Sequence, residues 1–138
     1  MATVTEAIQW IQAQLRALDG VRQSYDGPPD KVAGSLTALA YPPNGEIAPS
    51  TPVGTRTDFH NVIVQLQVPL KNIERDYATL VPYIEKAAAV IISDLTWGGN
   101  VETITATSRR IPYTLGPATW NGIDILRLQF TVSIKIVQ

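Results

Sequence analysis

Asp58 and His60 are the two side chains of this sequence whose types and spacing come closest to a chemical site. They stand two positions apart in an alternating, strand-like run, so both would lie on one face of a sheet. A metal-binding facial triad needs two histidines and a carboxylate, and the chain has a single histidine. We therefore expect His60 to be satisfied locally by Asp58 or by the backbone. A small ligand-binding module or enzyme that uses this pair is kept as an alternative.

The composition excludes several other classes of site. The chain has no cysteine, which rules out disulfides, thiolate catalysis and zinc–thiolate sites. Its 11 basic and 12 acidic residues give a net charge of −1, which argues against a protein that holds nucleic acid by bulk electrostatics, since that needs a basic patch. We expect no sequence-specific nucleic-acid partner. No phosphate-binding loop, dinucleotide motif or serine-nucleophile motif occurs. We expect a protein that is not an enzyme, without catalytic residues, metal or cofactor.

The length and hydropathy indicate one soluble domain, residues 1–138. No apolar run approaches the roughly 20 residues that a membrane-spanning helix needs. The first residues lack the basic and apolar regions of a signal peptide. We expect no membrane partner, and the cytoplasm is the default location.

The first of the two helices that are expected to support the sheet is predicted over 4–19. Thr3 and Glu6 have the spacing of a capping box, in which each side chain satisfies an unpaired backbone N–H of the other. Apolar residues then recur at alternating spacings of four and three, which is typical of a helix with one buried face. Gly20 suits the left-handed position that ends a helix.

A second helix is predicted over 76–95, where apolar residues again follow helical spacing. Pro82 is tolerated only in the first turn, where its missing N–H costs nothing. Asp76 or Thr79 could cap the helix just upstream, and we favour Thr79, with any helix before Pro82 being a kinked lead-in.

Four strands complete the expected architecture. The two clearest runs alternate apolar and polar residues, which is typical of an antiparallel sheet covered on one face. We predict an α+β fold with two helices packed on one face of a four-stranded, mainly antiparallel sheet. The other face, which carries Gln65 and Gln67, is predicted to be solvated, to lie against a neighbour or to line a channel. The predicted strands span 36–41, 60–70, 101–108 and 124–137.

Two segments are predicted to project from this domain. Residues 42–58 hold four prolines and two glycines and are predicted to form an extended loop, which could be a lid or an arm. Residues 109–122 are predicted to form the tip of a C-terminal hairpin, whose aromatic side chains either fold back onto the domain's own core or dock onto another chain. Ten residues of these segments are the candidate protein-interaction residues: Pro43, Asn44, Glu46, Ile47, Arg56, Arg109, Arg110, Tyr113, Leu115 and Trp120.

The layout of the chain resembles the tail-terminator (tail-completion) proteins of long-tailed bacteriophages. The resemblance is carried by the amphipathic first helix, by "LTALAYPPNGE" running into its loop, by the alternating "HNVIVQLQVPL" and by the closing strand "DILRLQFTVSIKI". It implies a homo-oligomeric ring, typically a hexamer, that caps the tail tube and offers its other face to the head connector. It implies no catalytic residues.

The resemblance also implies partners and a location. The partners are other copies of the chain, the tail tube protein and a head–tail connector or adaptor protein, and the genome DNA would pass through the ring. The location is the tail or neck of the virion, assembled in the host cytoplasm. Another neck component, such as a head–tail adaptor, is the alternative within the same class.

Overall fold

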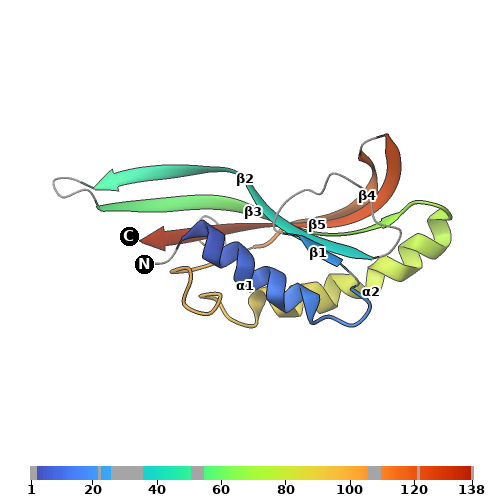
Figure 1. The fold of residues 1–138 in the computed structure, drawn as a ribbon, viewed down its shortest axis with the longest axis horizontal. Helices are drawn as coiled ribbons and strands as arrows, with labels where there is room; N and C mark the ends of the chain where they lie inside the picture. The colour runs from blue at the N-terminus through green and yellow to red at the C-terminus, as the bar shows by residue number, and fades with distance from the viewer. Residues whose placement is uncertain are drawn as a thin grey trace.

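The computed structural model describes residues 3–21, 23–25, 36–50, 55–105, 110–120 and 122–137 (Figure 1). A five-stranded sheet has the strand order β1-β2-β3-β5-β4, in which the four long strands pair antiparallel and the short β1 pairs parallel with β2. Both helices lie on one face of this sheet (Figure 1), so the predicted α+β class is confirmed. The elements are α1 (Val4–Arg16), β1 (Gln23–Tyr25), β2 (Thr37–Ser50), β3 (Thr55–Pro69), α2 (Ile73–Ile92), β4 (Tyr113–Trp120) and β5 (Ile123–Val137).

The first helix begins where the sequence predicts. The Thr3 hydroxyl accepts a hydrogen bond from the backbone N–H of Glu6 at 3.2 Å and caps α1. The helix ends at Arg16, three residues before the predicted end. The chain then continues through turns to Gly20. Gly20 has a φ of +89°, as its predicted left-handed conformation requires.

The second helix begins earlier than predicted. Its cap is Asn72, whose side-chain oxygen accepts from the backbone N–H of Arg75 at 3.0 Å, so Thr79 as the cap is wrong. The Thr79 hydroxyl instead donates to the Arg75 carbonyl inside the helix. Pro82 lies within α2, where the remaining backbone hydrogen bonds and the packing of the buried face outweigh its lost N–H. Among the described residues, no helix is long and apolar enough to cross a membrane.

The core lies between the helices and the face of the sheet that they cover, here called the helix face. Alternate residues of β3 and β5 face each other across the register, for example Val64 opposite Phe130 and Leu66 opposite Leu128. All four are at most 3% exposed. The buried stripes of α1 and α2 complete this cluster with Ile8, Ile11, Leu15, Leu80, Ala87 and Ile91.

The predicted loop over 42–58 is wrong. Most of that segment is strand, because β2 runs on to Ser50 and pairs with β3 down to Ser50 opposite Thr55. Proline cannot donate to a sheet, but an edge strand has no partner on its outer side and therefore tolerates it. Beyond Leu39, no described strand pairs with the outer edge of β2. Residues 51–54 lie outside the described residues.

The C-terminal third also differs from the prediction. The predicted strand over 101–108 is reduced to two isolated bridges to β5, at Thr103 and Thr105, within its described part. Much of the predicted hairpin tip over 109–122 is itself the strand β4, which pairs with β5 from Tyr113 to Trp120. The proline and glycine inside β4 are typical of a turn, so the sequence did not indicate a strand there. As in β2, the strand tolerates proline because it lies at the edge of the sheet.

The sheet face away from the helices, here called the outer face, is not simply solvated. Gln65 is fully buried and Gln67 is 2% exposed, although both point to this face. The Gln65 side-chain nitrogen donates to the Gln67 side-chain oxygen at 2.7 Å. Their predicted exposure is therefore wrong.

Candidate functional site

The most distinctive feature of the molecule is the part of the β2–β3 hairpin that extends past the helices (Figure 1). We call it the wing, and define it as residues 42–50 of β2 and 55–61 of β3. Every side chain from Pro42 to Pro49 is exposed. The end of β5 supports the wing as a third strand, since Val137 still pairs with Thr57. The wing is therefore a sheet extension with one long open edge.

A β-bulge at Pro42 and Pro43 sets the orientation of the wing. Tyr41 pairs with Ile63 and Asn44 with Asn61, so two prolines stand opposite the single residue between those partners. The extra residue reverses the alternation of β2, as bulges do. As a result Asn44 and the residue two positions on, Glu46, point to the outer face.

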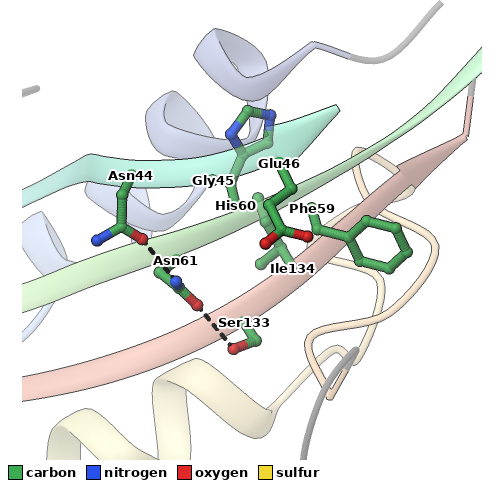
Figure 2. A pocket seen from close by; sticks show the side chains of 8 residues that line it. All are labelled: Asn44, Gly45, Glu46, Phe59, His60, Asn61, Ser133 and Ile134. Carbon is green, nitrogen blue, oxygen red and sulfur yellow. Dashed lines mark hydrogen bonds between the residues drawn. The ribbon is translucent and has the colours of Figure 1, made fainter. Parts of the chain in front are cut away.

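Three polar side chains form a hydrogen-bonded row across three strands of the outer face, which we call the amide rung. The Asn61 side-chain nitrogen donates to Asn44 Oδ1 at 2.6 Å, and the Ser133 hydroxyl donates to Asn61 Oδ1 at 3.0 Å. Figure 2 shows the row running from β2 through β3 to β5. It lines an open cavity of about 530 Å³.

A second row of side chains lies beside the rung in the same cavity. Glu46 is the cross-strand partner of Phe59, and Figure 2 shows both side chains on the same side of the sheet as the rung. Phe59 in turn is the partner of Lys135, whose Nζ lies 3.5 Å from Glu102 Oε2. The cavity therefore combines amides, a hydroxyl, a carboxylate and a phenyl ring.

Asp58 and His60 point to the helix face, opposite the rung. Asp58 is 4% exposed, and its Oδ1 lies 3.1 Å from Arg56 Nε. The His60 Nε2 lies 3.8 Å from Asp58 Oδ2, which is an ion-pair distance but too long for a hydrogen bond. A lid over this pair is not formed by 42–50, because β2 lies beside β3 with Gly45 paired to His60. Within the described part of the chain, no group of three metal-ligating side chains is placed to hold an ion.

The structure separates the candidate interaction residues into two groups at opposite ends of the sheet (Figure 1). One group lies in the wing, where Ile47 is 58% exposed. The other lies in and just before β4, where Tyr113 is 51% exposed. Arg109 lies outside the described residues. The wing group is Pro43, Asn44, Glu46, Ile47 and Arg56, and the described members of the β4 group are Arg110, Tyr113, Leu115 and Trp120.

An apolar groove lies between α2 and β4. The Tyr113 ring is 5.9 Å from that of Phe130 and tilted by 45°, which forms one wall. Ile84, Ala88 and Ile92 of α2 form the other wall, and the groove has a volume of about 160 Å³. Ile92 is 55% exposed, so the apolar surface of α2 is wider than the part that covers the sheet.

The carboxylate of Asp76 anchors the start of α2. It accepts hydrogen bonds from the backbone N–H groups of Lys71 at 2.8 Å and Asn72 at 3.1 Å. The Lys71 bond contributes most to lowering the pKa of Asp76, against the opposing effect of burial, and the Asn72 bond and Arg75 lower it further. The charged carboxylate of Asp76 therefore stabilises the start of α2, in the half of the molecule where helices cover the sheet.

Of the cavity residues on the outer face, Phe59, Asn61 and Ser133 were not among the predicted interaction residues. Their alternation with apolar neighbours placed them on one sheet face, and that signal was available. The missing information was the register, because only the bulge at Pro42 and Pro43 brings Asn44 level with Asn61.

No known protein-family model matches the chain. No curated protein matches its sequence. Among solved structures, a chain from "Virion of native gene transfer agent (GTA) particle" is similar at 15% sequence identity and a TM-score of 0.39, over 93% of each chain. At that identity and TM-score, the likeness does not decide the fold or the function of this protein.

Proposed function

We propose that this chain is a structural virion protein of a long-tailed phage, and that it forms a closed ring which terminates the tail tube and joins it to the head connector. The observation that carries the proposal is the wing, whose eight residues from Pro42 to Pro49 are all exposed on an edge strand. A sheet extension that no helix covers and that leaves one edge unpaired gains little stability by itself. A partner that contacts it is the best explanation for so long an extension.

The positions of the wing and of β4 favour a ring built from several copies of the chain. The wing and β4 lie at opposite ends of the molecule (Figure 1), and both are edges of the same sheet. Contact between two different surfaces of identical chains is heterologous, and it closes into a ring when the rotation between copies allows it. The wing of one copy would then meet the β4 end of the next.

Exposed apolar side chains support the same arrangement. Several of them gather around α2 and β4, where Ile92, Leu95 and Tyr113 are each at least 51% exposed. In the wing, Ile47 is the corresponding exposed apolar side chain at 58%. Apolar surface of this kind, left open in a single chain, is typical of contacts in an assembly.

The layout that resembles tail-terminator proteins supplies the more specific part of the proposal. The partners would be other copies of the chain, the tail tube protein and a connector or adaptor protein, and the location would be the neck of the virion. A head–tail adaptor is the closest alternative, since it would use the same wing and the same open edges.

The test is electron microscopy of the purified protein together with a capping assay on assembling tail tubes. A shortened variant, which lacks residues 48–57 and joins the cross-strand partners Ile47 and Asp58 through an Asn-Gly turn, keeps the sheet register. We expect rings and tubes of defined length with the natural protein, and neither with the shortened variant. Normal rings and normal capping by the shortened variant would overturn the role of the wing.

Rings that form but leave tube length unregulated would favour the adaptor over the terminator. If the protein is instead a ligand-binding module that uses His60 and Asp58, we expect a monomer or dimer. His60→Ala should then abolish its ligand binding. Rings and capping that survive His60→Ala would argue against that alternative.

A further inference from the structure

The cavity over the amide rung lies on the face of the wing opposite the exposed Ile47 side chain and has a composition of its own. It lies on the outer face of the wing (Figure 2), whereas the exposed side chain of Ile47 pairs with Asp58 on the helix face. Its volume of about 530 Å³ is in the range of sites for small ligands. It is open on one side, so a ligand could enter it directly.

The rung fixes the orientation of its amides. Asn61 donates to Asn44 and accepts from Ser133, so both ends of its side chain are held. Because the Asn44 oxygen is engaged, its side-chain NH₂ points away from the bond and is available to a ligand oxygen. Among the described residues, no hydrogen bond uses that NH₂ group.

The second row supplies a matching acceptor. Glu46 is exposed, and no ion pair or hydrogen bond to its carboxylate is found in the described part of the chain. The donor and the acceptor therefore stand two residues apart on one strand face, about 7 Å along the chain. The bulge at Pro42 and Pro43 aims both of them at the cavity.

Phe59 adds a flat apolar surface beside these polar groups. Its ring is half-buried between the partners Glu46 and Lys135, and Figure 2 shows it next to the Glu46 carboxylate. An aromatic face of this kind can stack on the C–H face of a ring that carries polar groups at its rim.

We propose that the amide rung, Glu46 and Phe59 form a binding site for a neutral saccharide with neighbouring hydroxyl groups. One sugar hydroxyl accepts from the Asn44 NH₂ group, and another donates to the Glu46 carboxylate. The apolar face of the sugar ring packs on Phe59. A hydroxyl both donates and accepts, which is what a site with one free donor and one free acceptor requires.

Other ligand classes match this set less well. The Glu46 carboxylate repels an anion such as phosphate, and the nearby cation Lys135 is already paired with Glu102. An ammonium group could use Glu46 and Phe59, but it carries no acceptor for the Asn44 amide. Of these three classes, the saccharide is the one that uses the Asn44 amide, the Glu46 carboxylate and the Phe59 ring together.

The test is saturation-transfer difference NMR on the full chain, a ligand-observed method that works for a monomer and for a large ring alike. The probes are methyl β-glucoside and methyl α-mannoside, with butylammonium as the cationic probe. We expect saturable transfer to a glycoside, strongest at the C–H protons of one ring face, with millimolar affinity.

Two variants and a matched control sharpen the test. Asn61→Ala removes the centre of the rung and Glu46→Gln removes the carboxylate charge, and each should weaken glycoside binding by about tenfold. Asn100→Ala, a change of the same amide on the loop after α2, should leave binding unchanged. No transfer to either glycoside, equal transfer in all variants, or transfer to butylammonium alone would overturn the proposal.

Discussion

The helix-covered half of the sheet and the wing are built from the same strands but are stabilised differently. From Val62 to Val68, each residue of β3 is buried, whereas from Pro42 to Pro49 each residue of β2 is exposed. The covered half gains its stability from apolar burial between two layers. The wing depends on strand pairing and on a few cross-strand side chains, so its surface is free to serve contacts. We expect changes in the first region to unfold the protein and changes in the second to alter what it binds.

The largest expected effect is on the covered half, at Trp97. This side chain is fully buried, stacks on Trp10 with ring centroids 6.1 Å apart, and donates from Nε1 to the Ile91 carbonyl. Trp97→Ala should lower the free energy of unfolding by about 3–5 kcal/mol, measured by chemical denaturation. Trp120→Ala on the half-buried edge strand should cost clearly less, and equal losses would contradict the distinction between the core and the sheet edge.

A smaller and local effect is expected in the wing at Gly45. A Cβ added there would collide with the backbone carbonyl of Phe59 and would lie 2.9 Å from His60 Nδ1. Gly45→Ala should cost about 1–3 kcal/mol and speed hydrogen–deuterium exchange in the wing while the covered half stays protected. The control is Gly116→Ala in β4, where a Cβ meets nothing within 4 Å. Uniformly faster exchange over the whole chain would show that the wing is not a separate region.

A pH-dependent effect is expected at Asp76 in the covered half. The backbone N–H bonds from Lys71 and Asn72 lower its pKa below the ordinary 3.8, so the native state favours the charged carboxylate. The stabilisation is fully present above that unfolded-state value and is lost as the pH falls through the lower native-state pKa. Asp76→Asn should cost about 1–2 kcal/mol at neutral pH.

Unfolding of the natural protein and of Asp76→Asn, measured between neutral pH and acid, gives the check. The difference between the two should shrink as the pH falls through the native-state pKa of Asp76. A difference that stays constant down to acid would show that the carboxylate charge contributes nothing.

Much of the covered half could be predicted from the sequence, because burial imposes a period on it. The apolar stripe of α1 and the alternation of β5 follow from that period. The cap at Thr3 follows from its spacing to Glu6. The start of α2 could not be predicted, because Pro82 argued locally for a later start. The tertiary packing of Leu80 and Ile91 overrides that local preference.

The wing could not be predicted for the opposite reason. Residues 42–49 are exposed on both sides of the strand and therefore have no burial period, and their prolines and glycine are typical of a loop. Only the pairing with β3 reveals a strand, and only the bulge decides which side chains face the cavity. Asn44 and Glu46 were recognised as candidates for binding a protein, whereas the two rows that they form, one with Asn61 and one with Phe59, required the register.

The smallest expected effect on stability, and the largest on assembly, is at Ile47. Because Ile47 is 58% exposed, Ile47→Asp should cost no more than about 1 kcal/mol, mainly from repulsion by its cross-strand partner Asp58. The matched control is Ile73→Asp, at a residue that is 59% exposed at the start of α2, away from the wing.

Sedimentation velocity of the natural protein, Ile47→Asp and Ile73→Asp at equal concentration tests the central claim most directly. The proposed ring predicts a discrete species several times the 15.0 kDa chain mass for the natural protein and for Ile73→Asp, and a folded monomer for Ile47→Asp. A natural protein that sediments as a monomer at every concentration, or an Ile47→Asp variant that assembles as well as the control, would contradict it.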